Sequence, residues 1–397
     1  MTNSLNAPLA RLIAGQICLH ACMAGMRMAA PLLALQQGYS AAAVGVLLAL
    51  FALTQVFLAL PAGRFADRHG LRRPVRWSVG MAFSGAALAV AFPVFPVLCL
   101  SALMTGGAAG VAVIALQRHV GRAAGNPTQL KQVFGWLSIG PAVSNFIGPF
   151  AAGLLIDHAG PSAGSLPGYR TAFALMAVLS LATWFWVRHT RELPAVAPKT
   201  GVARSRVRDL LREPLMGRLL LVNWLLSSCW DVHTFVVPIL GHERGYSASV
   251  IGTILGAFAI AAAVIRLFLP MLAAHLKEWV VVSMAMGITA LIFAVYPLMP
   301  SALTMGLCSV LLGLTLGSVQ PMIMSTLHQI TPPHRQGEAL GLRLMTINAS
   351  SVMMPLLFGA AGALIGVSGV FWVVGAAVGA GTRPAWRLRP KTARPAG

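Results

Sequence analysis

Acidic residues are scarce in this sequence: nine Asp and Glu stand against 29 Lys and Arg in 397 residues. Charged residues of both signs make up only 10% of the chain, whereas hydrophobic residues make up 57%. A water-soluble protein could not bury so large an apolar fraction, so the composition predicts that a lipid bilayer is the solvent. It excludes an ordinary soluble domain.

The formal charge of +20 would by itself favour a nucleic-acid partner. The positions of the basic residues argue against that, because we place 24 of the 29 in the N-terminus, the even-to-odd connections between apolar runs, and the C-terminal tail. This is the positive-inside distribution. It predicts an integral protein of the cytoplasmic (plasma or inner) membrane with both termini in the cytoplasm.

Cysteine is also scarce, and the five cysteines show neither zinc-ligand nor redox spacing. The sequence contains no phosphate-binding G-x-x-x-x-G-K-[ST] loop and no H-E-x-x-H or C-x-x-C motif, and no G-x-S-x-G constellation in it supports intramembrane catalysis. We therefore expect no metal, no cofactor and no enzymatic activity, and nucleotide-driven pumping is disfavoured. A proton gradient is the expected energy source.

What the chain has in abundance is long apolar runs bounded by Gly, Pro and charge, each about 20 residues long and so able to span a bilayer. They predict an all-α membrane protein with twelve transmembrane helices. The predicted spans are 11–35, 42–62, 75–95, 98–119, 132–156, 171–189, 217–240, 248–270, 279–298, 302–326, 338–364 and 366–382.

The chain repeats itself. A shift of 207 residues aligns 38–41 with 245–248, both Gly-Tyr-Ser-Ala, and a shift of 206 aligns Gly135 with Gly341. The repeat predicts two pseudo-symmetric six-helix bundles. The expected domains are an N-terminal half (1–190), a cytoplasmic linker (191–216), a C-terminal half (217–382) and a basic tail (383–397).

The segment 63–73 reads G-x-x-x-D-R-x-G-x-R-R between the second and third spans. We interpret it as a short cationic loop in which glycines permit a tight reversal. The motif resembles the loop between helices 2 and 3 of the major facilitator superfamily of secondary transporters. Leu71 stands where that family usually has an arginine.

The resemblance implies that Asp67 faces the N-terminus of helix 11, where free amides and the helix dipole attract an anion. Glu338, in the first turn of that helix, is expected to pair with Arg64 or Arg68. The predicted conformational latch comprises Gly63, Asp67, Arg68, Gly70, Arg72, Arg73 and Glu338. The equivalent loop of the second half has Pro270, Ala274 and His275 in place of Gly63, Asp67 and Arg68, which predicts that it has lost the latch chemistry.

Helix 7 carries a polar stripe at helical spacing, and the repeat maps it onto a second stripe in helix 1. In the superfamily these two helices line the central cavity, so we expect the stripes to face each other across the substrate pathway. The predicted substrate and proton pathway comprises Gln16, His20, Arg27, Asn223, Ser227, Asp231, Thr234 and, from helix 10, Gln320.

Asp231 lies near the bilayer middle, where a carboxylate is costly and is a functional candidate. It either exchanges protons during transport or is a structural acid paired with Arg27 or a backbone donor. Arg27 binds an anionic substrate, switches the protonation of Asp231, or only forms that structural pair. His20 is a proton relay or a hydrogen-bonded structural residue. Arg266 and Arg343 are expected to extend to the nearby cytoplasmic surface.

Helix 5 contains Gly148, Pro149 and Gly153, which resemble the glycine-proline motif of the superfamily's proton-driven antiporters. Small residues let the helix approach a neighbour, and proline kinks it. The alternative is ordinary helix packing, because Pro355 and Gly359 repeat the pattern in helix 11. The arginine that many proton-coupled members carry in helix 4 is absent.

The resemblance implies a secondary transporter working by alternating access. We expect proton-coupled export of a small organic, drug-like compound. One alternative is symport uptake of a small organic anion, and a second is a transporter-like receptor or scaffold without flux. The expected partners are a small-molecule substrate and the lipid bilayer, with no nucleic acid, and the expected state is a monomer.

Overall fold

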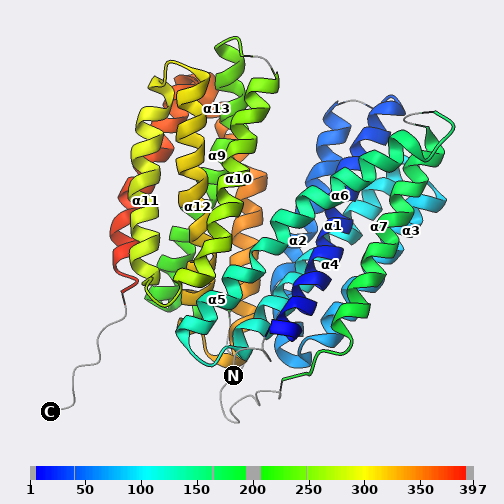
Figure 1. Cartoon of the computed structure of the whole chain (residues 1–397), viewed down its shortest axis with the longest axis horizontal. Coiled ribbons are helices and arrows are strands. Elements are labelled where there is room, and N and C mark those ends of the chain that lie inside the picture. The colour runs from blue at the N-terminus through cyan, green and yellow to red at the C-terminus, as the bar shows by residue number, and fades with distance from the viewer. Residues whose placement is uncertain (1–5, 40, 163–164, 194–206, 247, 390–397) are drawn as a thin grey trace. The chain divides into compact units, whose positions relative to one another are not determined.

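The computed structural model describes residues 6–39, 41–162, 165–193, 207–246 and 248–389, and all regular structure in these residues is helical (Figure 1). The all-α class predicted from the sequence is confirmed. The α-helices are α1 (Asn6–Gln36), α2 (Ala41–His69), α3 (Arg72–Ala91), α4 (Phe95–Ala123), α5 (Pro127–Leu137), α6 (Ile139–His158), α7 (Leu166–Val187), α8 (Val207–Arg212), α9 (Pro214–Glu243), α10 (Ala248–Leu272), α11 (Glu278–Val295), α12 (Ala302–Ile330) and α13 (Gln336–Trp386). Two short 3₁₀ turns are η1 (Tyr296–Leu298) and η2 (Pro333–Arg335).

Ten segments in the described residues are long and apolar enough to cross a membrane, and one of them joins α5 and α6. The other two predicted spans correspond to α3 and to the first part of α13. Helix α13 covers both of the last predicted spans. A non-helical residue, Gly366 (φ +73°), divides it into two helices between those spans. Glycine tolerates this left-handed value.

The structure divides into two compact units, which we describe separately. The first comprises the described parts of Met1–Asn126, Trp136–Val202 and Thr331–Val352. The second comprises the described parts of Pro127–Gly135, Ala203–Ile330 and Met353–Gly397. Each unit thus includes a short segment from the other half of the sequence. The domain limits predicted from the repeat remain a prediction.

In the first unit, α1 packs against α4, α6 and α7, while α4 also packs against α2 and α3. Small residues allow these helices to lie close together. A Cβ added to Gly106 in α4 would lie 2.2 Å from the Phe51 carbonyl oxygen in α2. Helix backbones therefore touch directly, as in many membrane bundles, where close van der Waals packing drives association.

In the second unit, α12 packs against α9, α10 and α11. The same close approach recurs, since a Cβ on Gly313 of α12 would lie 2.3 Å from the carbonyl oxygen of Phe258 in α10. A buried polar cluster joins these helices: Ser309 hydrogen-bonds both the His233 ring (2.9 Å) and the Tyr296 hydroxyl (2.8 Å).

The interpretation of 63–73 as a loop is wrong for most of its length. Helix α2 continues to His69, and only Gly70 and Leu71 separate it from α3. Gly70 has φ +74°, so it alone makes the left-handed turn. The consequence is that Asp67 lies on the last turn of a helix and not on a flexible connection.

Candidate functional site

The first feature of the candidate site is the docking of Asp67 onto the start of α13. The Gly337 amide donates to Asp67 Oδ1 (2.9 Å), and the Glu338 amide donates to Oδ2 (3.0 Å). These are first-turn amides, which have no partner within their own helix. The helix dipole adds a favourable field for the carboxylate. The two carboxylate oxygens of Asp67 thus accept hydrogen bonds from two first-turn amides of α13.

Two glycines allow this docking. A Cβ on Gly63 would lie 2.1 Å from the carbonyl oxygen of Gly337, and a Cβ on Gly337 would lie 2.3 Å from that of Gly63. One turn further on, a Cβ on Gly341 would lie 2.3 Å from the Ala59 carbonyl oxygen. The sequence pattern predicted a reversal at Gly63, but in the structure this glycine allows two helices to touch.

A residue that the sequence analysis missed, Arg118 of α4, completes the environment of Asp67. Its Nε donates to Asp67 Oδ1 (2.6 Å) and its Nη2 donates to the Asp67 carbonyl (3.2 Å). The Arg118 side chain is only 3% exposed. A buried guanidinium needs such a partner, because removing one member of a buried pair leaves an uncompensated charge. No motif in the sequence links this arginine to Asp67.

Glu338 forms the second ionic contact of this region. Arg64 Nη2 lies 3.1 Å from Glu338 Oε1, and Arg335 Nη2 lies 2.8 Å from Oε2. The structure therefore brings Glu338 to Arg64, one of the two arginines expected. The Arg335 contact was not anticipated. Because Arg64 is half exposed, its share of the interaction is screened by solvent.

The turn between α2 and α3 is held by another unanticipated residue, Glu192, which follows α7. Its carboxylate accepts hydrogen bonds from the amides of Leu71 (3.0 Å) and Arg72 (2.5 Å). Arg72 Nε also donates to the Thr190 carbonyl (2.9 Å). Glu192 thus caps the start of α3 from a distance in sequence. Leu71, which stands where the family usually has an arginine, is fully buried.

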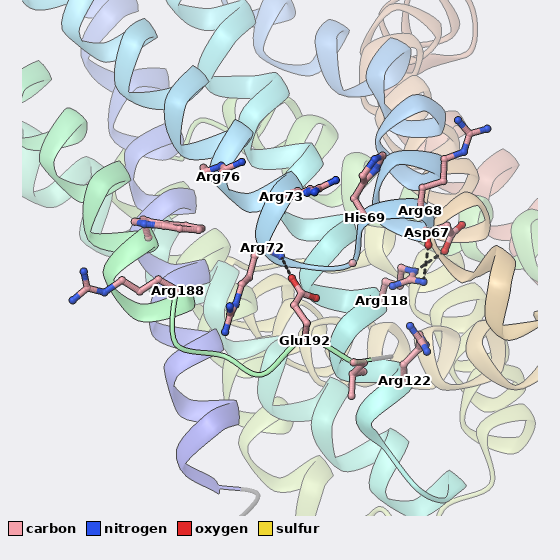
Figure 2. A pocket seen from close by; sticks show the side chains of 13 residues that line it. Asp67, Arg68, His69, Arg72, Arg73, Arg76, Arg118, Arg122, Arg188 and Glu192 are labelled. Atoms are coloured by element: carbon pink, nitrogen blue, oxygen red, sulfur yellow. Dashed lines mark hydrogen bonds and ion pairs between the residues drawn. The ribbon is translucent and has the colours of Figure 1, made fainter. Parts of the chain in front are cut away.

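A cavity of about 610 Å³ opens beside this turn (Figure 2). Figure 2 shows Arg118 directed at Asp67 and Glu192 lying against the beginning of α3. The predicted latch residues Arg68 and Arg73 are exposed and line the cavity. Its basic lining consists of Arg68, His69, Arg72, Arg73, Arg76, Arg118, Arg122 and Arg188.

Along the polar stripe of α1, side-chain exposure increases from Gln16 to Arg27. Gln16 is 3% exposed and packs against Gly140 of α6, where an added Cβ would lie 3.1 Å from its Oε1. His20 is half-buried and shares a small cavity with Gln16 and α4. Arg27 is exposed. The structure therefore brings Gln16 and His20 together inside the first unit.

The stripe of α9 shows the same gradient. Asn223 is 1% exposed, and neither of its side-chain polar atoms has a hydrogen-bond partner among the described residues. Ser227 and Asp231 are half-buried, while Thr234 is exposed and bonds the Trp230 carbonyl of its own helix. Gln320 of α12 is half-buried. That the two stripes face each other stays a prediction.

The glycine-proline motif lies in α6, where it makes close packing contacts. A Cβ on Gly148 would lie 2.3 Å from the Ala21 carbonyl oxygen of α1, whereas one on Gly153 would only reach ordinary contact, 3.4 Å, with Met28. Pro149 lies inside the helix. Gly148 therefore serves the α1–α6 contact, and an antiporter role of the motif remains a prediction.

Of the two arginines expected to extend to the cytoplasmic surface, Arg343 contradicts the prediction, and for Arg266 it stays a prediction. Arg343 is 5% exposed, so it does not extend to a surface. The Arg266 guanidinium lies 5.7 Å from the centre of the Trp230 ring, a cation–π distance. A nearby aromatic face or a buried pocket can hold an arginine that the sequence pattern alone would send to the membrane surface.

An all-helical chain with at least ten bilayer-length apolar segments defines a polytopic membrane protein. A family model described as Major Facilitator Superfamily matches residues 12–341 and, in a second match, 219–397. The chain belongs to this family, and it is an integral membrane protein that transports small solutes. No curated protein sequence gives a significant match.

Solved structures share the fold over nearly the whole chain. A bacterial homologue of the iron transporter ferroportin, in an outward-facing state, is 17% identical, with a TM-score of 0.77 covering 96% of this chain and 98% of that one. The human organic anion transporter MFSD10 (TETRAN) is 16% identical, with a TM-score of 0.78 covering 97% and 100%. The transporter FucP is 14% identical, with a TM-score of 0.79 covering 97% and 99%. At these identities the likeness shows the fold alone.

Proposed function

We propose that this protein exports a small organic, drug-like compound in exchange for protons by alternating access. The main observation in support of a transport cycle is the docking of Asp67 on the amides of Gly337 and Glu338. It joins the last turn of α2 to the Gly337 amide, 270 residues further along the chain in the first turn of α13. A contact built from reversible hydrogen bonds at this place supports a conformational latch on the cytoplasmic side.

Proton coupling is assigned to Asp231. This carboxylate is half-buried in a membrane-spanning helix, one turn from Ser227 and two from the buried amide of Asn223. An ionisable group in such a place is costly, which favours a functional reason for its presence. His20, Gln16 and Gln320 are the proposed substrate contacts in the other elements. The glycine-proline resemblance in α6 supports exchange over symport.

The second candidate is symport uptake of a small organic anion. Arg27 favours it, because an exposed guanidinium in a bilayer-spanning helix suits a carboxylate or phosphate ligand. The missing helix 4 arginine also favours it, since buried Ala102 lies in the part of α4 where many proton-coupled members of the family carry that arginine. One structural neighbour is described as an organic anion transporter.

Proteoliposomes with an imposed pH gradient separate these functions, with a panel of fluorescent organic cations and anions as probes. Exchange predicts accumulation in vesicles that are acidic inside. Symport predicts accumulation only when the outside is acidic. Flux that ignores both gradients would contradict proton coupling, and absence of flux for every probe would favour a receptor or scaffold.

A further inference from the structure

The symmetry-related position of the Asp67 contact contains a different set of polar groups. The 206-residue shift that aligns Gly135 with Gly341 places Lys131 of α5 opposite Gly337. The turn between α10 and α11 corresponds to the turn between α2 and α3, with Ala274 in the place of Asp67. The turn has no carboxylate at this position, and α5 carries a cation where α13 has Gly337.

Lys131 makes direct contacts with this second turn. Its side chain is buried, and Nζ donates a hydrogen bond to the Leu276 carbonyl oxygen (2.5 Å). Nζ also lies 3.9 Å from Glu278 Oε1. A buried ammonium is strongly unfavourable without such partners. The Leu276 carbonyl and the Glu278 carboxylate therefore account for the presence of a lysine at this depth.

The acceptor side is organised independently of Lys131. Glu278 Oε1 accepts hydrogen bonds from Ser325 Oγ (2.9 Å) and Gln329 Nε2 (2.8 Å), both on α12. Ser325 Oγ and Gln329 Nε2 are 3.0 Å apart. This network holds the carboxylate in place, so Lys131 docks onto a surface that is already arranged.

Close packing accompanies the polar contact, as it does at Asp67. A Cβ on Gly135 would lie 2.9 Å from Pro270 Cγ, and Pro270 is the repeat equivalent of Gly63. The Phe134 and His328 rings have centres 5.0 Å apart. Residues 127–135 consequently belong to the same compact unit as 203–330, although they precede the linker between the two halves.

We propose that Lys131 and the α10–α11 turn form a second cytoplasmic lock of opposite polarity to the Asp67 lock. In the Asp67 lock the charge is on the turn and the backbone groups are on the helix. In the Lys131 lock the charge is on the helix and the backbone acceptor is on the turn. The proposal rests on the transport cycle proposed above: both contacts break when the cytoplasmic side opens, and the ammonium of Lys131 then regains water.

The test is a distance measurement that needs neither substrate nor flux. Spin labels are placed at Pro127→Cys and His275→Cys, two exposed positions that flank the lock, in a variant without native cysteines. Pulsed electron-paramagnetic-resonance spectroscopy then gives the distance distribution in lipid nanodiscs. Lys131→Met keeps the length of the side chain and removes the charge, and Lys131→Arg keeps the charge.

The proposal predicts that Lys131→Met raises the population with the longer distance at least about fivefold, the effect of losing one charge-assisted hydrogen bond. Lys131→Arg should keep the parent distribution. Lys277→Met, a neighbouring exposed lysine, is the matched control and should change nothing. An unchanged distribution in Lys131→Met would overturn the proposal.

Glu278→Gln provides a second test if Lys131→Met does not yield folded protein, and it should shift the distribution in the same direction. A parent-like distribution in Glu278→Gln would then overturn the proposal. Failure of the lock and failure of the proposed function are distinguishable. If the parent shows proton-driven flux and Lys131→Met leaves the distance unshifted, only the lock is refuted. If Lys131→Met shifts the distance but the parent shows no flux, only the proposed function is refuted.

Discussion

The side chain of Asp67 receives hydrogen bonds from the amides of Gly337 and Glu338 at 2.9 and 3.0 Å, and from Arg118 Nε at 2.6 Å. The carboxylate therefore has three donors, one of them a buried cation. Two of its donors belong to a helix that lies far away in the sequence. This arrangement makes Asp67 the best-supported single position for a group that holds one conformation of the transporter.

Replacing Asp67 by Asn should slow cycling with little loss of ligand binding. The amide can still accept one hydrogen bond, but it loses the charge that pairs with Arg118. Charge-assisted hydrogen bonds contribute about 1.5–3 kcal/mol, so we expect transport to fall by roughly tenfold or more. Flux and ligand binding should be measured on the same proteoliposome preparation. Unchanged flux would refute the latch role.

The close approach of α2 and α13 gives a steric prediction. Gly337→Ala would put a methyl group about 2.3 Å from a backbone oxygen, and the backbone cannot move aside without displacing a helix. We expect Gly337→Ala to lose most of its transport activity while it remains membrane-inserted. Gly80→Ala in α3 is the matched control, since its added methyl would meet open space. Equal activity in both variants would argue against a working contact at Gly337.

Asp231→Asn should abolish the pH dependence of transport. The amide keeps the size of the side chain and cannot gain or lose a proton in the physiological range. Exchange of substrate across the membrane without a pH gradient should persist, because the loss concerns coupling and not binding. Flux measured from pH 5.5 to 8.5 provides the test. A variant with the wild-type pH response would exclude Asp231 from coupling.

Gly148 and Gly153 are expected to differ although they belong to the same motif. Gly148→Ala places a methyl 2.3 Å from the Ala21 carbonyl oxygen, so we expect destabilisation of about 1–3 kcal/mol and a lower unfolding temperature in detergent. Gly153→Ala meets Met28 at an ordinary contact distance and should be tolerated. If both variants unfold like the wild type, packing does not explain the motif.

The sequence was sufficient for the all-helical class, because twelve apolar runs can be recognised from composition alone. The contact of Asp67 with the start of helix 11 was implied by the resemblance of 63–73 to the family's loop, and the structure contains it as the bonds from the Gly337 and Glu338 amides. Arg118 and Glu192 were missed for a physical reason. Each reaches the site across the bundle from another helix or its end, and local spacing carries no information about such contacts.

The errors of the sequence analysis have equally specific causes. Gly63 was assigned to a turn because glycine permits one, but here glycine allows α2 to touch Gly337. The contacts of Lys131 with the equivalent turn of the second half were not anticipated. Lys131 lies on α5, and a comparison of loops alone does not include that helix.

The central claim is that the contact between α2 and α13 must open in every transport cycle. It is tested most directly by cross-linking Arg64→Cys to Glu338→Cys with a short, reducible bifunctional reagent, in a variant whose five native cysteines have been replaced. Proton-driven flux is measured before cross-linking, after it, and after reduction. The account predicts that flux is lost on cross-linking and returns on reduction. Undiminished flux in fully cross-linked protein would contradict it.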